Sequence, residues 1–458
     1  LINSGFDFPP KKITVNLAPA DLPKDGAAYD LPIAVGVLAA SGQLVLPKNK
    51  HQFFYGELSL DGVLRPTRGI LLLALHSRRH RNAEIFVPAQ SSSEASVVHD
   101  VSVFPVASLS ELFLHLSGSQ LIDKVRYRPI EKEIASAIID FDLKEVAGQE
   151  QAKRALMIAA AGGHNVLMWG PPGTGKTMLA RALPGILPPL TPQEALEVTR
   201  IYSISGLLAP GASIVSQRSF RSPHHGVSAA GLIGGGTNPQ PGEVSLAHLG
   251  VLFLDEMPEF PRSALESLRQ PMEDGVVEIV RVSGHVRYPA SFTLIAAINP
   301  CPCGYLGHPR RACKCTEKQI AKYRHRISGP ILDRIDLTVM VAPVEVEKLS
   351  ITNTKEVNGA GSAEVKQMVV KARKIQEKRF AGAPLYTNSQ MRNREVKKYS
   401  LLTKEAENFL KLAAEKYDFS ARSYMRLIKV ARTIADLAEE KNILPVHMAE
   451  ALQYKQLA

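Results

Sequence analysis

The stretch Gly170-Pro-Pro-Gly-Thr-Gly-Lys176-Thr177 fits the pattern G-x-x-x-x-G-K-[ST] at every fixed position. An apolar, strand-like segment at 165–169 precedes it and a helical pattern at 178–183 follows, which is the context that a phosphate-binding loop requires. Its glycines let backbone N–H groups close around phosphate oxygens at a helix N-terminus, where the helix dipole favours negative charge. A glycine turn that binds nothing is the alternative, and this context disfavours it. We predict an ATP site formed by Gly170, Pro171, Pro172, Gly173, Thr174, Gly175, Lys176 and Thr177.

Two residues of this loop and an acidic pair would carry the chemistry. Lys176 is expected to bring a positive charge to the β- and γ-phosphates, and the hydroxyl of Thr177 to bind Mg²⁺. A second apolar segment, 251–254, ends in Asp255 and Glu256. Two carboxylates are unfavourable at the end of a buried strand unless they meet a cation, so we expect Asp255 in the magnesium shell. Glu256 would polarise the attacking water as general base, which predicts hydrolysis as well as binding.

A third apolar segment, 292–298, ends in Asn299. A neutral amide at this place can hydrogen-bond both the γ-phosphate and the water without repelling either. Taken alone, Asp255 and Glu256 could mark a strand end that meets solvent, and Asn299 could mark a turn. The order of phosphate loop, acidic strand and Asn strand favours a catalytic site that contains Lys176, Glu256 and Asn299.

These apolar segments predict the fold class. They are uniformly apolar, which is typical of parallel strands covered by helices on both faces, so we expect an α/β fold with a parallel αβα sheet at 141–343. Short apolar segments separated by turns predict a smaller α/β domain at 1–116, and because the chain begins with Leu1 we expect an N-terminal piece to be missing from it. We interpret 117–140 and 344–361 as linkers and 362–458 as a helical domain.

Composition narrows the class of protein. The chain has 458 residues, 45% hydrophobic and 22% charged, which is the balance of a folded protein. No apolar stretch is long enough to span a bilayer and no signal-peptide pattern opens the sequence, so we expect a cytoplasmic protein without a membrane partner. The net charge of +11 favours polyanionic partners, although a basic surface without such a partner explains it as well.

The four cysteines form two close pairs, Cys301-x-Cys303 and Cys313-x-Cys315. This clustering argues against a disulfide scaffold and for one local site. Four thiolates suffice for a tetrahedral structural Zn²⁺ site, with His308 as a substitute ligand. The single residue between paired cysteines departs from the common two-residue spacing, so reduced cysteines without metal are the alternative.

Basic residues gather in three segments that could contact nucleic acid. The cysteine segment and the residues after it combine them with Tyr305 and Tyr323, a surface suited to phosphates and stacked bases. A solvated helix face is the alternative there. The glycine-containing segment 216–242 and the hairpin-like segment 276–288 are expected to be loops that grip a nucleic-acid backbone, and a metal pair at His224-His225 is a minority interpretation. The predicted contacts are Arg218, Arg221, His224, His225, Arg281, Arg287, Arg310, Arg311 and Lys314.

Several longer motifs resemble one family. The phosphate loop, Asp255-Glu256 and Asn299 resemble the magnesium-chelatase-like branch of AAA+ ATPases, as do Gly148-Gln149 and Gly329-Pro-Ile-Leu-Asp-Arg334-Ile-Asp336. The resemblance to the ComM/YifB family is closer, and it rests on Ala159-Ala-Ala-Gly-Gly-His-Asn165, Phe220-Arg-Ser-Pro-His-His225, Cys301-Pro-Cys303-Gly and Ala431-Arg-Thr-Ile-Ala-Asp-Leu437. It covers nearly the whole chain. It implies an AAA+ domain at 141–343 and assigns the segment 216–242 to the pore of a ring.

The resemblance also implies roles for two arginines. Arg334 matches the position that reaches into a neighbouring subunit's site as an arginine finger and stabilises charge on the transferring phosphoryl group. The alternative for Arg334 is a surface salt cluster with the flanking aspartates. Arg422 matches the helical-domain arginine called sensor 2, which contacts the γ-phosphate, with Arg426 one turn later as a fallback. A finger that acts in trans implies a ring, and the family resemblance implies a homo-hexamer.

The first domain resembles a different class of enzyme. Residues 56–88 resemble the peptidase domain of Lon-type proteases, and Pro23-Lys-Asp-Gly26 matches the start of its nucleophile motif. This chain has Ala28 where that family has its serine, and Ala83-Glu84 near the expected lysine. Without a hydroxyl and its base no acyl-enzyme can form. We therefore expect a Lon-protease-like, non-catalytic domain that serves as a scaffold or contacts DNA.

The residues themselves predict an ATPase whose loops are compatible with polyanions. The resemblance implies a hexameric, ATP-driven DNA helicase that promotes branch migration in homologous recombination during natural transformation. Its partners would be single-stranded or branched DNA and recombination proteins. Two alternatives stay open: a chelatase-type ring that remodels a protein partner for metal insertion, and a Lon-like ATP-dependent protease, which Ala28 opposes.

Overall fold

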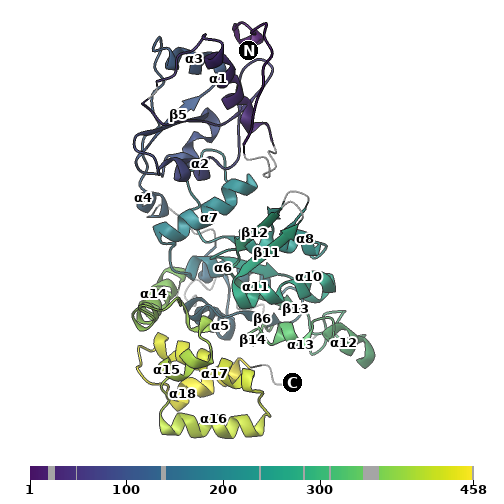
Figure 1. The fold of residues 1–458 in the computed structure, drawn as a ribbon. Coiled ribbons are helices and arrows are strands. Elements are labelled where there is room, and N and C mark those ends of the chain that lie inside the picture. Colours follow the sequence, from purple (N-terminus) through teal and green to yellow (C-terminus); the bar gives the residue numbers. More distant parts are fainter. Residues whose placement is uncertain are drawn as a thin grey trace, which may run out of the picture. The chain divides into compact units, whose positions relative to one another are not determined.

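The computed structural model describes residues 1–18, 26–47, 49–135, 141–236, 239–281, 284–308, 311–343 and 361–455. Its contacts divide the chain into two compact units (Figure 1). The first unit comprises Leu1–Ala137 and Leu190–Gln217, and the second comprises Ile138–Pro189 and Arg218–Ala458. The segment 190–217 thus belongs with the first unit, although it lies between two segments of the second. The domain bounds given above stay a prediction.

The first unit is built on a parallel three-stranded sheet in the order β1-β4-β5. Leu31, Phe86 and Leu112 lie in the core that the helices form with this sheet. The strands are β1 (Gln52–Phe54), β4 (Ala83–Pro88) and β5 (Val101–Val106), with a small hairpin of β2 (Glu57–Leu58) and β3 (Leu64–Arg65). The helices are α1 (Asp30–Ala40), α2 (Ile70–Ser77), α3 (Leu109–Leu116), α4 (Ile130–Ala135) and α7 (Pro192–Ser205).

Helix α7 is fixed to the first unit by polar contacts. The Gly69 N–H, just before α2, donates to the Ser203 carbonyl oxygen of α7 at 3.3 Å. The Ser203 hydroxyl donates to Glu94 Oε2 at 2.6 Å, and burial raises the pKa of Glu94. A partly buried carboxyl group is costly to separate from its hydroxyl partner, so these contacts hold α7 against the start of α2 and against the segment Ala89–Ala95.

The second unit contains a five-stranded parallel sheet in the order β14-β6-β13-β10-β7. Successive residues of β6 and β10 enter two different cores: Met168 and Phe253 pack into one, and Leu167 and Leu252 into the other. Because side chains alternate across a strand, apolar cores cover both faces of the sheet. The predicted α/β class with a parallel sheet is confirmed. The strands are β6 (Val166–Trp169), β7 (Phe220–Arg221), β10 (Val251–Leu254), β13 (Thr293–Ile298) and β14 (Leu337–Met340).

Helices and two hairpins surround this sheet. Helix α6 begins directly at Lys176, after Gly175 with φ +89°. The helices are α5 (Glu150–Gly162), α6 (Lys176–Ile186), α8 (Ala229–Ile233), α9 (Glu243–Leu246), α10 (Arg262–Ser267), α11 (Arg269–Asp274), α12 (Glu317–Arg324) and α13 (Gly329–Leu332). The hairpins are β8 (Gly234–Gly235) with β9 (Gln240–Pro241), and β11 (Val276–Arg281) with β12 (Gly284–Pro289).

The C-terminal region is helical, as predicted. A buried polar network joins it to the sheet domain: the His164 ring lies between Asp336 Oδ2 at 3.0 Å and Thr433 Oγ1 at 2.8 Å. The fully buried Arg432 pairs with Asp436 on the same helix. Breaking such a buried pair by removing one partner costs about 3–5 kcal/mol. The helices are α14 (Ser362–Arg379), α15 (Asn393–Tyr399), α16 (Lys404–Lys416), α17 (Ala421–Leu437) and α18 (Pro445–Gln453).

Among the residues that the structure describes, no helix has both the length and the apolar character needed to cross a membrane.

The predicted likeness of the first domain to Lon-type peptidases rests on residues of which the structure describes only some. The match to the nucleophile motif at Pro23-Lys-Asp-Gly26 lies mostly outside the described residues. Ala28 and Ala83 are both buried. The likeness to Lon-type peptidases, and with it the match of Ala28 to the position of the nucleophilic serine, therefore stays a prediction.

Candidate functional site

The phosphate loop follows β6 at the carboxyl edge of the second unit's sheet. At Gly170 a Cβ atom would lie 2.1 Å from the carbonyl oxygen of Val341, so only glycine fits beside β14. Gly173 and Gly175 have φ values of +76° and +89°, which L-residues with side chains rarely adopt. The conformation of the loop thus requires the glycines that the motif prescribes.

Lys176 is the buried cation of this loop. Its ammonium group donates to the carbonyl oxygens of Gly170 at 2.7 Å and Pro171 at 2.9 Å, and to Asn299 Oδ1 at 3.2 Å. Burial lowers the pKa of Lys176, whereas the charges of Asp255 and Glu256 oppose that shift. The loop therefore presents a desolvated positive charge, for which phosphate oxygens are stronger partners than neutral carbonyls.

The two predicted magnesium ligands lie in contact. The Thr177 hydroxyl donates to Asp255 Oδ2 at 2.9 Å, and the Glu256 N–H donates to Asp255 Oδ1 at 3.0 Å. A hydroxyl and a carboxylate are oxygen donors of the kind that Mg²⁺ prefers. These residues fit the ion chemically.

Glu256 has an unusual backbone conformation. Its φ of +49° lies in the left-handed region, which is rare for a residue with a side chain. Its side chain is exposed. Strain of about 1–3 kcal/mol at such a position is characteristic of functional sites, where the surrounding structure holds it.

Asn299 lies beside Lys176, and the buried ring of Tyr323 supports Asn299. Tyr323 of α12 is buried, with a relative exposure of 5%, so the prediction that it stacks on bases is wrong. Burial raises the pKa of Tyr323 to about 12, and a hydrogen bond with the backbone of Asn299 opposes the shift. No local sequence pattern links the two residues. Their contact depends on how α12 folds back on the strand end.

Arg334 lies at the opposite edge of the same sheet. It comes three residues before Leu337, which pairs with Val166 at the start of β6, and its carbonyl oxygen accepts from Asn165 Nδ2 at 2.9 Å. The phosphate loop begins after Trp169, at the other end of β6. A strand of this length separates the two edges by on the order of 10 Å. Arg334 is therefore brought together with residues of the amino edge and not with Lys176.

The guanidinium group of Arg334 is held within the chain. It forms an ion pair with Glu273 of α11 and donates to the Pro330 carbonyl oxygen at 2.7 Å. Among the described residues, Arg334 Nε has no hydrogen-bond partner. Glu273 is more than half exposed, so this pair meets solvent on one side.

Arg422 lies on the same edge as Arg334. Its guanidinium is 4.0 Å from both Glu273 and Asp333 and is about half exposed. Arg426 is more enclosed and donates to the carbonyl oxygens of Leu332 at 3.2 Å and Ile335 at 2.7 Å. The fallback arginine thus anchors α17 to the Arg334 segment, whereas Arg422 is the arginine of this pair that solvent reaches.

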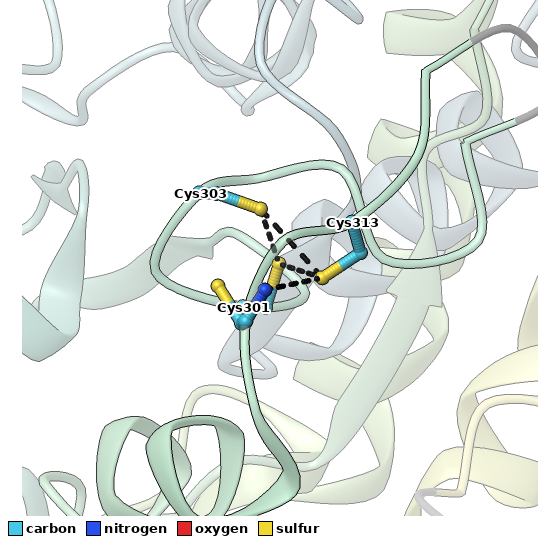
Figure 2. Close-up of side chains that lie close together, drawn as sticks. Cys301, Cys303 and Cys313 are labelled. Atoms are coloured by element: carbon cyan, nitrogen blue, oxygen red, sulfur yellow. Dashed lines mark hydrogen bonds between the residues drawn. The ribbon is translucent and has the colours of Figure 1, made fainter.

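The four cysteines come together as the spacing predicted. Their sulfur atoms all lie within 4.8 Å of one another, and Cys301, Cys303 and Cys313 are separated by 3.4–3.6 Å (Figure 2). Tetrahedral zinc with Zn–S bonds of about 2.3 Å requires sulfur atoms about 3.8 Å apart. These distances exclude disulfides, which require about 2.05 Å. The donor set fits a structural zinc ion, and His308 is not needed as a ligand.

The cysteine loop is joined directly to the nucleotide site. Cys301 follows Asn299 by two residues, and a Cβ at Gly304 would lie 2.7 Å from Pro172 of the phosphate loop. Hydrogen bonds with the backbone of Tyr305 and Lys314 lower the pKa of Cys303 to about 6, which favours the thiolate that a metal binds. No local sequence pattern indicates this close approach, because Gly304 and Pro172 are far apart in the chain.

The predicted nucleic-acid contacts divide into two groups. Arg218 donates to the carbonyl oxygens of Pro188 at 2.6 Å and Leu249 at 2.7 Å. Arg221 forms a bidentate pair with Glu243 at 2.7 and 2.8 Å. Both guanidinium groups are thus engaged inside the chain, an arrangement that competes with phosphate binding.

The other predicted contacts are more accessible. The rings of His224 and His225 lie 4.0 Å apart between centroids, and the exposed Arg287 is 3.8 Å from Glu278 across the β11–β12 hairpin. Arg311 lies over the Tyr305 ring at 5.2 Å, and Lys314 is exposed. Arg310 and the side chain of Arg281 lie outside the described residues.

Comparison with protein families gives three matches that together span most of the chain. Residues 142–349 match the family described as magnesium chelatase, subunit ChlI, and residues 359–455 match its C-terminal family. Residues 1–91 match the family described as subunit ChlI of Mg-chelatase. The residues of the nucleotide site and Arg334 lie within the first of these matches, and Arg422 lies within the second.

Comparison with individual proteins adds full-length relatives. The chain is 43% identical over 463 residues to the uncharacterized protein YifB of Salmonella typhimurium, covering 100% of this chain and 87% of that protein. It is 43% identical over 467 residues to the competence protein ComM of Haemophilus influenzae, covering 100% and 88%. A magnesium-chelatase 38 kDa subunit of Rhodobacter capsulatus is 29% identical over 179 residues, covering 35% of this chain and 50% of that protein. The chain therefore belongs to the ComM/YifB family of magnesium-chelatase-like AAA+ ATPases.

Proposed function

We propose that the chain is an ATP-hydrolysing ring motor that acts on DNA, a hexameric helicase that promotes branch migration in homologous recombination during natural transformation. The observation that carries the ATPase part is the contact of Lys176 with Asn299 beside that of Thr177 with Asp255. These contacts bring together the groups that would bind phosphate, metal and water. The DNA part is supported by the relative named competence protein ComM and by the basic charge.

Hydrolysis would proceed as an in-line displacement at the γ-phosphorus. The Glu256 carboxylate accepts a proton from a water molecule whose oxygen attacks the γ-phosphorus, and the bond from that phosphorus to the β–γ bridging oxygen breaks, releasing ADP and phosphate. Lys176 neutralises charge on the phosphate oxygens, and Asn299 orients the water by accepting or donating a hydrogen bond. Mg²⁺, held by Thr177 and Asp255, would supply further positive charge at the β- and γ-phosphates.

A ring supplies the positive charge that one chain lacks at this site. Because Arg334 and Arg422 share the edge opposite the phosphate loop, both would act on the nucleotide of a neighbouring subunit. In the single chain Glu273 neutralises Arg334. A neighbour's triphosphate carries more negative charge than one exposed carboxylate, so it would draw Arg334 away from Glu273. A head-to-tail interface of this kind closes into a ring, for which we propose six subunits.

A second candidate function is a ring that remodels a protein partner for metal insertion, as a magnesium chelatase does. It is favoured by the matches to chelatase families and by the 30% identity over 194 residues to a magnesium-chelatase 67 kDa subunit of Heliobacterium mobile. That likeness covers only 36% of this chain, whereas the YifB and ComM likenesses cover all of it. We therefore prefer the DNA motor.

The test is the ATPase rate of the full chain with and without single-stranded and forked DNA, across a salt series. We expect DNA to raise turnover severalfold at low salt, with the stimulation falling as salt rises because phosphate contacts are displaced by counterions. If DNA neither binds nor raises turnover at low salt, the motor fails and the chelatase-type ring becomes the better account. A casein digestion assay tests the protease alternative, for which we expect no ATP-dependent cleavage.

A further inference from the structure

The first unit carries a cationic hollow of its own. About 560 Å³ in volume, it is lined by Leu72, Leu75, His76, Arg78, Arg79 and Arg200, and we call it the arginine hollow. Its residues come from α2, the turn after α2, and α7, all within the first unit. It is therefore formed independently of the nucleotide site, whose residues belong to the second unit.

The helices around the arginine hollow are firmly held. Helix α2 buries Ile70, Leu71 and Ala74 against the core, so that His76 projects from its other side. Helix α7 buries Thr199 and Ile201 on either side of the exposed Arg200, and its contact through Ser203 fixes it to α2. The backbone that carries the arginines is therefore fixed before a ligand binds, so that only their side chains lose conformational entropy on binding.

The arginines of the hollow lack salt-bridge partners in the described part of the first unit. Among its described residues, no ion pair within 4.0 Å involves Arg78, Arg79 or Arg200. All three arginines are exposed. Unpaired arginines around a concave surface attract anions, and their planar guanidinium groups suit phosphate oxygens.

A cluster of rings extends from His76, one of the residues that line the hollow. His76 has the Phe53 ring 6.3 Å away between centroids, and Phe53 in turn lies 5.5 Å from His80. His51 is 4.8 Å from His80. Cations beside aromatic and imidazole rings combine phosphate pairing with base stacking, the two contacts that single-stranded nucleic acid offers. A free phosphate or a lipid headgroup would use only the first.

We propose that the arginine hollow binds the phosphodiester backbone of single-stranded DNA, with Arg78, Arg79 and Arg200 on phosphates and the neighbouring rings against bases. The choice of DNA over other polyanions rests on the proposed function. The hollow would give the chain a point of attachment to DNA outside the ATPase unit, so that the strand stays bound while nucleotide-dependent loops release it.

The experiment compares two charge reversals of equal size in the full chain. Arg78→Glu/Arg79→Glu removes two cations of the hollow, and Lys11→Glu/Lys12→Glu removes two exposed cations of the same unit that do not line it. Binding of a fluorescent single-stranded oligonucleotide is measured by anisotropy across a salt series. We expect the first variant to bind about tenfold or more weakly at physiological salt. We also expect its salt slope to fall by about 1.4, because each phosphate contact contributes about 0.7. The control should match the wild type.

The outcomes separate this inference from the proposed function. If DNA stimulates the wild-type ATPase but the Arg78/Arg79 variant binds like the control, the inference is wrong and the motor stands. If that variant loses DNA binding while DNA never stimulates turnover, the hollow stands and the motor fails. Loss of binding to anionic vesicles alone, with oligonucleotide binding unchanged, would also overturn the proposal in favour of a lipid surface. Far-ultraviolet circular dichroism and thermal unfolding that match the wild type show that the variant is folded, and Arg78→Gln/Arg79→Gln serves if it is not.

Discussion

The two edges of the sheet in the second unit differ in how completely one chain satisfies their charged groups. At the carboxyl edge Lys176 is buried and has three oxygen acceptors, and Thr177 donates to Asp255. At the amino edge Arg334 and Arg422 share the exposed carboxylate of Glu273. At the first edge one chain thus contains all the groups proposed to bind the nucleotide, whereas at the second edge the two arginines pair with Glu273 and Asp333, carboxylates that are about half exposed.

This difference indicates which steps of the ATPase reaction require a neighbouring subunit. Nucleotide binding should depend on the carboxyl edge alone, since its groups are preformed. Turnover should also depend on the amino edge, but on that of another subunit. Substitutions at the carboxyl edge should therefore lower both nucleotide affinity and ATP turnover, whereas substitutions at the amino edge should lower turnover alone. Mixing a variant of each kind should restore part of the turnover.

The largest effect is expected at the carboxyl edge. Lys176→Ala removes the buried charge that the phosphates meet, so nucleotide binding and turnover should both fall below detection. Equilibrium binding of a fluorescent ATP analogue checks this. Glu256→Gln is the matched control, because it should keep the binding while hydrolysis stalls. Normal binding by Lys176→Ala would show that the loop does not hold the phosphates.

The next effect is expected at the amino edge. Arg334→Ala should leave nucleotide affinity within about twofold of the wild type and reduce turnover by about 10³-fold, the effect of removing an arginine finger. Steady-state ATPase kinetics and analogue binding are measured on the same preparation. Turnover that survives in Arg334→Ala would support the surface salt cluster instead.

A smaller effect is expected from the cysteine loop, which lies against the carboxyl edge. The wild type should carry about one zinc ion per chain, and Cys301→Ser should lose it, because three thiolates bind zinc less firmly. Nucleotide affinity should then fall about tenfold, since Asn299 and Pro172 lose their support. Metal analysis and analogue binding are the measurements, with Lys314→Ala as a control in the same loop. A wild-type chain without bound metal would favour reduced, unliganded cysteines.

The smallest effect concerns how the helical region is attached to the amino edge. Arg426→Ala leaves the carbonyl oxygens of Leu332 and Ile335 without their donor, which should lower the free energy of unfolding by about 1–3 kcal/mol. Thermal unfolding of this variant is compared with that of Arg422→Ala, whose exposed side chain should change stability by less than about 0.5 kcal/mol. Equal stability of the two variants would contradict the anchoring role of Arg426.

The sequence predicted the carboxyl edge well, for a physical reason. Its groups follow strands or lie in one continuous loop, and parallel strands bring their carboxyl ends to a common edge, so local motifs identify Lys176, Asp255 and Asn299 as neighbours. The apolar strands likewise predicted the parallel sheet, and the long helical patterns predicted the C-terminal helices.

The remaining features depend on contacts between distant segments. No local sequence pattern pairs Arg334 with Glu273 or brings Tyr323 to the backbone of Asn299. The same is true of the contacts of His164 with Asp336 and Thr433. The segment 190–217 belongs to the first unit although the chain has already entered the second. No linker composition indicates this return to the first unit. Base stacking by Tyr323 is predicted from its place among basic residues, a local pattern that cannot distinguish an exposed ring from a buried one.

The central claim, that one chain's Arg334 acts on another chain's nucleotide, is tested most directly by mixing two inactive variants. Lys176→Ala keeps the finger and Arg334→Ala keeps the phosphate loop, so a mixed ring contains some interfaces with both. With random mixing at equal amounts, roughly one interface in four is intact, and ATPase activity should return to about a quarter of the wild-type rate. Each variant alone should stay inactive. A mixture that hydrolyses no more ATP than its components, under conditions where the subunits exchange, would contradict the claim.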